Sequence, residues 1–216
     1  MSSGGSKPEE TVGDAVARRV EARRGRASAW AEAMRELGAV DRAVYEAVAR
    51  TLTAELDDPV RRLSESANYS RLWLAIAAAL ALLGGAHGRR AAMEGVVSIA
   101  VTSATVNLGV KSLHRRRRPD RVESDGSPNR HVPMPASTSF PSGHAASAFA
   151  FAYAVGRHIP ALAVPIRLLA AGVAYSRVHT GVHYPGDVVV GSVVGAGTAA
   201  VVAAAGDRLL GRCGRA

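Results

Sequence analysis

Residues 188–205 read VVVGSVVGAGTAAVVAAA, a stretch of 18 residues without a single charged side chain. A helix needs roughly 20 apolar residues to cross the hydrocarbon core of a bilayer, which is about 30 Å thick. The stretch therefore predicts a transmembrane helix over residues 187–206. The alternative, a helix buried in a water-soluble bundle, is disfavoured by this lack of charge and by the many Gly, Ala and Ser residues, which let membrane helices approach closely.

Four other apolar runs precede this helix, separated by short charged connections such as His87-Gly88-Arg89-Arg90. Two of the five runs are long enough to cross a bilayer alone, and the others reach that length with flanking polar residues. We therefore expect an integral membrane protein of the all-α class, a polytopic transmembrane helix bundle of about five spans with N-terminal amphipathic helices. The expected spans are residues 72–87, 91–113, 145–157, 161–176 and 187–206.

The first 70 residues differ from the rest because they are rich in charge. Apolar residues recur there at four-residue spacing from Val44 to Leu56, which predicts a helix with one apolar face, and Asp58-Pro59 is typical of the start of another helix. Such helices are too polar to span a membrane. The expected organisation is a disordered tail at 1–14, a polar and amphipathic helical region at 15–70, a transmembrane domain at 71–208 and a short basic tail at 209–216.

The chain is strongly basic, with a formal net charge of +9 and a sequence pI of about 10.7. A GC-rich genome would explain why nearly all the cations are Arg, whereas a functional explanation is attraction to anionic phosphates. Without aromatic interleaving or zinc-finger spacing, no nucleic-acid partner is expected. The single cysteine, Cys213, excludes an internal disulfide and a multi-cysteine metal site.

Polar groups at the ends of apolar membrane helices are costly and usually functional. Here they form three clusters, and successive spans cross the membrane in alternating directions, so the loops 114–144 and 177–186 are expected on the same side. The clusters should therefore converge on one surface. They are Lys111 with Arg118-Pro119, then Pro141-Ser142-Gly143-His144, and then Ser176-Arg177 with His183 and Asp187.

The residue types in these clusters suit a phosphoryl group. The cations include Arg118 and Arg177, whose forked guanidinium groups match phosphate oxygens, and Ser142 opens a helix, where amides and the helix dipole favour an anion. His183 and Asp187 can form a base-and-orienter pair. No carboxylate cluster is available for magnesium, so a reaction without a metal or another cofactor is expected.

The three clusters resemble the signature of the type 2 phosphatidic acid phosphatase family, K-x6-R-P, then P-S-G-H, then S-R-x5-H-x3-D, and every defining position is occupied. The resemblance covers residues from about 72 to about 206. It implies a membrane phosphatase that hydrolyses a phosphomonoester or a diphosphate on a lipid, the candidates being a polyprenyl-linked phosphate, phosphatidic acid and phosphatidylglycerol phosphate. Similarity to small bacterial members favours a polyprenyl-linked substrate of cell-envelope synthesis and a bacterial plasma membrane location. Neither the exact lipid nor the oligomeric state is indicated.

The resemblance also implies roles for individual residues. His183 would attack phosphorus and form a phosphohistidine, Asp187 would orient His183, and His144 would protonate the leaving lipid alkoxide and later activate water. No metal site is implied. The phosphate oxygens would be held by Lys111, Arg118, Ser142, Gly143 and Arg177.

Other polar residues near the clusters are interpreted differently. Arg115, Arg116, Arg117 and Arg121 are read as lipid headgroup contacts or positive topology signals. His179 lies outside the signature and is a lesser candidate for substrate contact. Trp73 and Tyr184 could serve as interfacial anchors or as substrate contacts.

Two other functions compete with the phosphatase. A vanadate-dependent haloperoxidase has a similar phosphate pocket, but those enzymes are larger and soluble, in contrast to the apolar spans here. A non-catalytic lipid-binding protein on the same scaffold would be expected to have lost His144, His183 or Asp187, and all three are present.

Overall fold

The computed structural model describes residues 12–51, 53–110, 116–121 and 130–213. These residues contain helices and irregular segments and no strand, which confirms the all-α expectation. They divide into two compact units, one up to Arg42 and one from Ala43 onward. The predicted tail at 1–14 lies mostly outside the described residues, so it stays a prediction.

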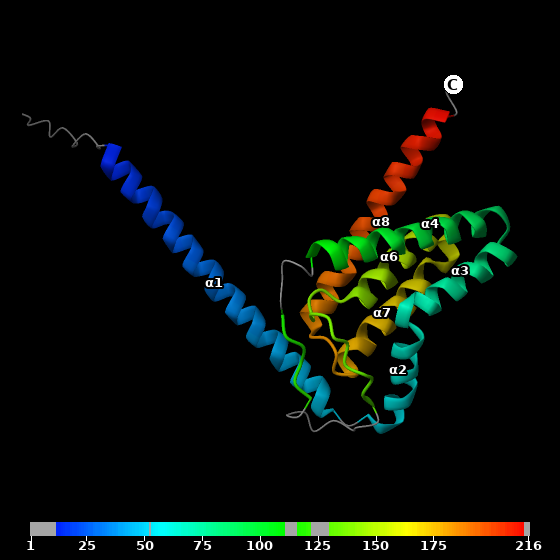
Figure 1. The fold of residues 1–216 in the computed structure, drawn as a ribbon, viewed down its shortest axis with the longest axis horizontal. Coiled ribbons are helices and arrows are strands. Elements are labelled where there is room, and N and C mark those ends of the chain that lie inside the picture. Colours follow the sequence, from blue (N-terminus) through cyan, green and yellow to red (C-terminus); the bar gives the residue numbers. More distant parts are fainter. Residues whose placement is uncertain (1–11, 52, 111–115, 122–129, 214–216) are drawn as a thin grey trace, which may run out of the picture. The chain divides into compact units, whose positions relative to one another are not determined.

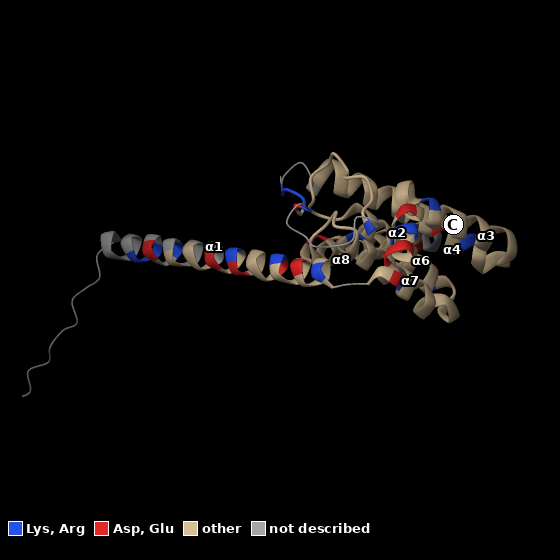
Figure 2. Cartoon of the chain, turned by 90° about the horizontal axis from the view of Figure 1, so that it is seen from below, with Lys and Arg blue, Asp and Glu red and all other residues tan. Residues whose placement is uncertain are grey.

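Helix α1 (Val12–Arg50) carries acidic and basic side chains along its length, whereas the helices of the second unit are mostly uncharged (Figure 2). Its last turns belong to the second unit, where Tyr45 and Ala49 are buried. The predicted apolar stripe is wrong in detail. Val44 is exposed, and Leu56 lies on the next helix because helix α1 ends at Arg50.

Helix α2 (Ala54–Ser66) begins one turn before the predicted start at Asp58-Pro59, so Pro59 lies inside it. The backbone N–H groups of Leu56 and Asp57 already donate to the carbonyl of Thr53. The helix starts earlier than predicted because the buried side chain of Asp57 is paired with side chains from distant segments.

A sharp bend of 65° joins α2 to the next helical pair, the 3-10 turn η1 (Asn68–Ser70) and helix α3 (Arg71–Leu83). Tyr69 and Ser70 have φ angles of 54° and 58° at this bend. Left-handed conformations are costly for residues other than glycine and asparagine and are usually held by the surrounding structure.

In the described residues the five apolar runs are mostly helical, but the first is interrupted at Gly84, and the expected connection at 87–90 lies inside helix α4. Fewer than five helices are long and apolar enough to be spans. Three helical stretches qualify. The first, Gly85–Gly109, consists of α4 (Gly85–Ala104) and most of the π-helical segment η2 (Thr105–Val110). The second, Pro160–His179, consists of η4 (Pro160–Leu162) and α7 (Ala163–His179), and the third, Pro185–Leu209, is most of α8 (Pro185–Cys213). The bent α2–α3 pair could be a fourth.

Helix α6 (Gly143–His158) is shorter than a membrane span requires. Its 16 residues extend about 24 Å, less than the roughly 30 Å of a bilayer core. It packs against α4, α7 and α8 and is largely buried among them, so its apolar surface faces protein (Figure 1). By length and composition, three or four helices therefore qualify as spans, compared with the expected number of about five.

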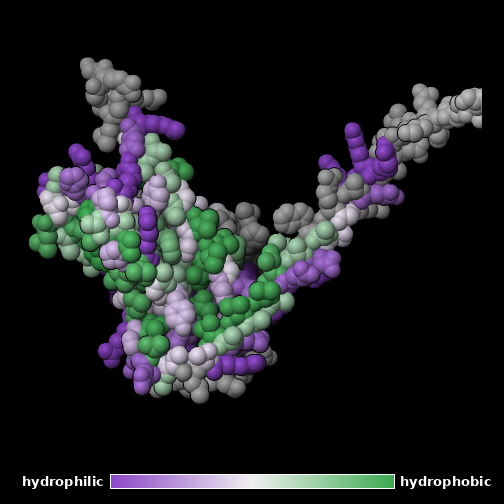
Figure 3. Space-filling view, turned by 180° about the vertical axis from the view of Figure 1, so that it is seen from behind, coloured by the Kyte–Doolittle hydropathy of each residue, from purple (hydrophilic) through white to green (hydrophobic). Residues whose placement is uncertain are grey.

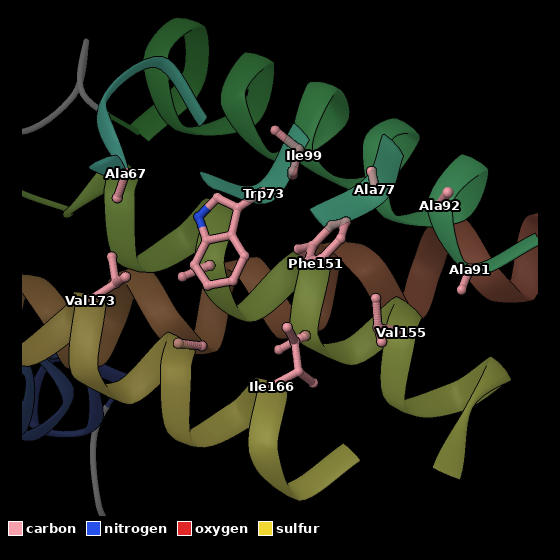
Figure 4. Packing of buried hydrophobic residues seen from close by; sticks show 13 residues of the cluster. Ala67, Trp73, Ala77, Ala91, Ala92, Ile99, Phe151, Val155, Ile166 and Val173 are labelled. Carbon is pink, nitrogen blue, oxygen red and sulfur yellow. The ribbon is translucent and has the colours of Figure 1, made fainter. Parts of the chain in front are cut away.

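The apolar core lies between α3, α4, α6 and α7, with Trp73 and Phe151 at its centre (Figure 4). Their ring centroids are 5.6 Å apart, and Trp73 is only 1% exposed. The interpretation of Trp73 as an interfacial anchor is therefore wrong. The outer surface of the bundle also shows many apolar side chains, as expected for helices that face lipid (Figure 3).

Helices α6 and α8 approach closely because two glycines of α8 face α6. A Cβ atom on Gly191 would overlap the carbonyl oxygen of Ser142, and one on Gly195 would overlap that of Ala146. Small residues let membrane helices come this near. This contact places the N-terminus of α6 directly beside the first turn of α8, where the sequence clusters meet.

Candidate active site

His183 lies in the short loop between α7 and α8, which the backbone holds tightly. The N–H groups of Val182 and His183 both donate to the carbonyl of Arg177, each at 3.1 Å. Gly181 turns the chain with a φ of +69°, and a side chain there would also crowd Arg121 and Tyr45. The loop therefore presents His183 in one fixed position.

Arg121 also holds this loop in place through hydrogen bonds. Its guanidinium donates to the carbonyls of Gly181 at 3.2 Å, Thr180 at 2.9 Å and Val132 at 2.8 Å. The interpretation of Arg121 as a headgroup contact is therefore corrected. The residue joins the segment that follows Arg118 to the loop that carries His183.

The predicted convergence of the first and third clusters is confirmed at the His183 ring. Nη1 of Arg118 is 3.3 Å from Nε2 of His183 and also donates to the carbonyl of Val182 at 2.6 Å. A guanidinium can only donate, so Nε2 must present its lone pair. The proton of the neutral ring is then on Nδ1, which faces Oδ2 of Asp187 at 3.5 Å.

The protonation state of His183 follows from its surroundings. Burial lowers the pKa of His183 to about 4, since the charged imidazolium loses solvent, while Asp187 opposes this shift and Arg118 adds to it. Burial also lowers the pKa of Arg118, whose guanidinium nonetheless stays charged. Near neutral pH the site thus holds a neutral imidazole beside a cation.

Asp187 is held as a carboxylate by donors from three segments. Arg116 forms a salt bridge with Oδ1 at 2.9 Å, while the Ser139 hydroxyl and the Tyr184 backbone N–H donate to Oδ2. Arg116 also lies over the Tyr184 ring, 4.2 Å from its centroid. Arg116 and Tyr184 therefore support Asp187, which corrects their interpretation as headgroup contact and interfacial anchor.

Ser142 joins the second cluster to the third. Its backbone N–H donates to the carbonyl of Asp187 at 2.9 Å, and its hydroxyl caps α6 by accepting from the Ala145 N–H at 3.4 Å. The Ser142 amide is thus used within the protein, contrary to the expectation that it would face an anion. Gly143 opens α6, where the first amides have no partner within the helix.

His144 and Arg177 each have a polar partner from the α2–α3 region, one in the bend and one near the end of α2. Nε2 of His144 is 2.9 Å from Oδ1 of Asn68, and because an amide oxygen only accepts, Nε2 carries the proton. Arg177 is 1% exposed, and its guanidinium donates to the Ser64 hydroxyl at 2.6 Å. Lys111 lies outside the described residues.

His179 belongs to a buried polar network instead of a substrate surface. Its Nε2 is 2.9 Å from Oδ1 of Asp57, which also forms a salt bridge with Arg130 at 3.2 Å. Arg130 further donates to the backbone carbonyls of Ala49 and Thr51. The network ties α1, α2 and α7 to the segment that leads into α6.

Sequence reasoning missed the residues that support the signature: Ser64, Asn68, Arg116 and Ser139. No periodicity marks them, and their roles arise from contacts between segments 48 to 113 residues apart. Of these four residues, only Arg116 could have been suspected from the sequence, since it precedes Arg118 by two residues. Among the described residues no group of three or more His, Cys, Asp or Glu side chains could hold a metal ion.

A family model and two curated relatives match this chain. The family described as the PAP2 superfamily matches residues 91–209. The decaprenylphosphoryl-5-phosphoribose phosphatase of Mycobacterium tuberculosis is 36% identical over 148 residues, which cover 68% of this chain and 78% of the relative. That of Mycolicibacterium smegmatis is 38% identical over 135 residues, covering 61% and 68%.

Two solved structures share the fold at low sequence identity. The first transmembrane PAP2 type phosphatidylglycerolphosphate phosphatase from Bacillus subtilis matches with a TM-score of 0.61 and 21% identity, over 80% of this chain and 87% of that chain. LpxE of Aquifex aeolicus matches with a TM-score of 0.62 and 20% identity, over 74% and 92%.

Proposed function

This chain belongs to the PAP2 superfamily and is an integral membrane lipid-phosphate phosphatase, and we propose that it cleaves a terminal phosphomonoester of a polyprenyl-linked lipid through a phosphohistidine at His183. The observation that carries this mechanism is the orientation of the His183 ring. Its Nε2 lone pair faces Arg118, and its Nδ1 faces Asp187.

In the first step Nε2 of His183 attacks phosphorus and the bond from phosphorus to the lipid oxygen breaks. His144 acts in this step as an imidazolium, which gives its Nε2 proton to the departing alkoxide and becomes neutral, and the alcohol leaves. Asp187 stabilises the positive charge that develops on the His183 ring. Arg116, Ser139 and the Tyr184 amide hold that carboxylate in place.

In the second step water attacks phosphorus while His144, now neutral, accepts one of its protons. The bond from phosphorus to nitrogen breaks, inorganic phosphate leaves, and both histidines return to their starting states. General acid–base catalysis of this kind contributes typically 10²–10⁴-fold to a rate.

The phosphate oxygens need charge that is not already paired. Neither Arg118 nor Arg177 forms a salt bridge with a carboxylate among the described residues, and Arg118 lies against the nucleophile. We assign these two cations, together with Lys111, the Gly143 amide and the Ser142 hydroxyl, to the transferring phosphoryl group. Donors fixed where charge develops lower the barrier without reorganisation.

The polyprenyl part of the proposal rests on the mycobacterial relatives, whose names specify a decaprenylphosphoryl-5-phosphoribose. The match to the family model covers residues 91–209, which include the site residues from Arg116 to Asp187. The solved structures support the fold alone, because their identities are 20–21%.

The test is phosphate release by the purified protein in detergent and EDTA. The panel contains a polyprenylphosphoryl sugar phosphate, polyprenyl phosphate, phosphatidic acid and phosphatidylglycerol phosphate. We expect release by the wild type and by His158→Ala, a matched histidine variant at the other end of α6, and none by His183→Ala. Release by His183→Ala would refute the mechanism, and a preference for phosphatidic acid over both polyprenyl lipids would refute the proposed substrate.

A further inference from the structure

A cavity of about 200 Å³ lies beside His144, between the α2–α3 bend, the end of α4 and the start of α6. It is smaller than the roughly 300–1,000 Å³ of sites for drug-sized ligands, so it can hold part of a substrate but not a lipid tail. The lining residues that matter here are Tyr69, Ser70, Ser103, Asn107, His144 and Ser147.

The cavity is lined by neutral polar groups that the protein does not use. Among the described residues, no side-chain hydrogen bond is formed by Ser70, Ser103, Asn107 or Ser147, although Ser147 is only 7% exposed. Hydroxyl and amide groups both donate and accept, so they match the hydroxyl groups of an alcohol. No Lys or Arg is among the described lining residues, but Gly143 and His144 are, so the cavity adjoins the phosphate site without sharing its cations.

The backbone around the cavity is unusual on two sides. Tyr69 and Ser70 are in left-handed conformations, and Asn107 lies in the π-helical segment at the end of α4. Strained residues and π-helical turns are often found at functional sites. Here both irregular segments place polar side chains around the same small volume.

The position of the cavity on the reaction path identifies the group it receives. If His144 protonates the leaving oxygen, the carbon atoms attached to that oxygen must lie next to His144, and the cavity is there. We infer that the cavity binds the alcohol moiety that leaves, that this moiety carries neighbouring hydroxyl groups, and that Asn107 and Ser147 select for it. This inference rests on the proposed function.

Two lipid classes supply such a leaving group, namely a sugar in a polyprenylphosphoryl sugar phosphate and glycerol in phosphatidylglycerol phosphate. Polyprenyl phosphate and phosphatidic acid provide the comparison, because their leaving alcohols have no free hydroxyl neighbour. The measured quantity is the ratio of kcat/KM for a hydroxylated substrate to kcat/KM for its hydroxyl-free partner. A general folding defect cancels in this ratio.

We expect the wild type to prefer at least one hydroxylated substrate, and the substrate that it prefers distinguishes sugar from glycerol. Asn107→Leu and Ser147→Ala should each lower the ratio by roughly two- to tenfold, the effect of one lost hydrogen bond of ordinary strength. Ser192→Ala is the matched control, because that hydroxyl donates to its own helix at the Val188 carbonyl and lies outside the cavity lining.

The failures are distinguishable. A wild type that releases phosphate from all four lipids without preference would overturn the inference and leave the proposed mechanism standing. Equal ratios in the wild type, Asn107→Leu and Ser147→Ala would overturn the assignment of these two residues. A wild type that is inactive on every lipid would refute the proposed function and the inference with it.

Discussion

The two ends of the bundle both carry clustered charges, but the charges are arranged differently. At the end where α6 finishes, Arg157 pairs with Glu94 at 2.8 Å and with Asp207 at 2.6 Å, and His158 also contacts Glu94 at 2.9 Å. Where α6 begins, Asp187 is paired with Arg116, while Arg118 and Arg177 have no salt bridge among the described residues.

This difference separates a structural cluster from a binding site. The cations and acids around Arg157 neutralise one another, so little field remains for a ligand. Around His183 the described cations exceed the carboxylates, and the partly buried Arg118 and the buried Arg177, which have no salt bridge to an acid among the described residues, favour a dianion such as phosphate. The two clusters are separated by the length of α6, about 24 Å.

The largest effect is expected for Asp187→Asn, which keeps the shape of the side chain but removes its charge. The amide would still fill the position beside Ser139 and Arg116, but it could not stabilise a positive His183 ring. We expect kcat to fall by roughly 10³–10⁴-fold, as for the loss of an orienting carboxylate in other catalytic systems. A loss of less than tenfold, with thermal stability maintained, would show that Asp187 is not the partner of the nucleophile.

Arg118→Gln and Arg157→Gln compare the two ends directly. Removing the unpaired Arg118 should lower kcat/KM by about 10²–10³-fold, the usual cost of one transition-state donor. Arg157 is partly exposed and its salt bridges are worth about 1 kcal/mol or less, so Arg157→Gln should stay within a few-fold of the wild type. Similar losses in both variants would remove the distinction between the ends.

The close packing of α6 against α8 can be tested by measuring the thermal stability of glycine variants. Gly195→Ala places a methyl group against the Ala146 carbonyl, and such overpacking costs about 1–3 kcal/mol. Gly197→Ala is the matched control two residues away, where nothing lies within 4 Å. The melting temperature in detergent should fall for the first variant and stay level or rise for the second.

The depressed pKa of His183 predicts a pH dependence of stability. A histidine in the unfolded chain binds its proton near the ordinary value of 6.5, whereas His183 in the folded site does so only at about 4. Folding is therefore disfavoured as the pH falls from about 6.5 to 4, with a slope of up to about 1.4 kcal/mol per pH unit.

The control for this dependence is His183→Gln, which cannot take up the proton. Its melting temperature should fall less steeply than that of the wild type over the same pH range. Parallel curves for the two proteins would indicate that the imidazole is not held in its neutral form by burial.

The sequence predicted the catalytic and phosphate-binding residues better than the residues that hold them in place. The positions of Arg118, His183 and Asp187 could be predicted because they lie at the ends of apolar runs, whose alternating directions bring distant loops together. Asn68 and Ser139 could not be predicted, because their roles depend on the α2–α3 bend and on the path of the loop before α6. Neither feature has a local periodicity.

The fold shows the same limit. Hydropathy predicted that residues 145–157 form a helix, but it could not show that this helix is central and too short to be a span. Such a helix is as apolar as a lipid-facing one, and only its packing distinguishes them. The start of α2 was misplaced for a related reason, because the buried salt bridge of Asp57 overrides the helix-start signal at Pro59.

The most direct test of the central claim is the capture of the phosphorylated enzyme. The wild type is mixed with a substrate labelled with ³²P at its terminal phosphate and is quenched in alkali, in which phosphohistidine survives, within the first turnover. We predict label on the peptide that contains His183 and none on the His183→Ala protein. Label on a different residue, or phosphate release by His183→Ala at the wild-type rate, would contradict the account.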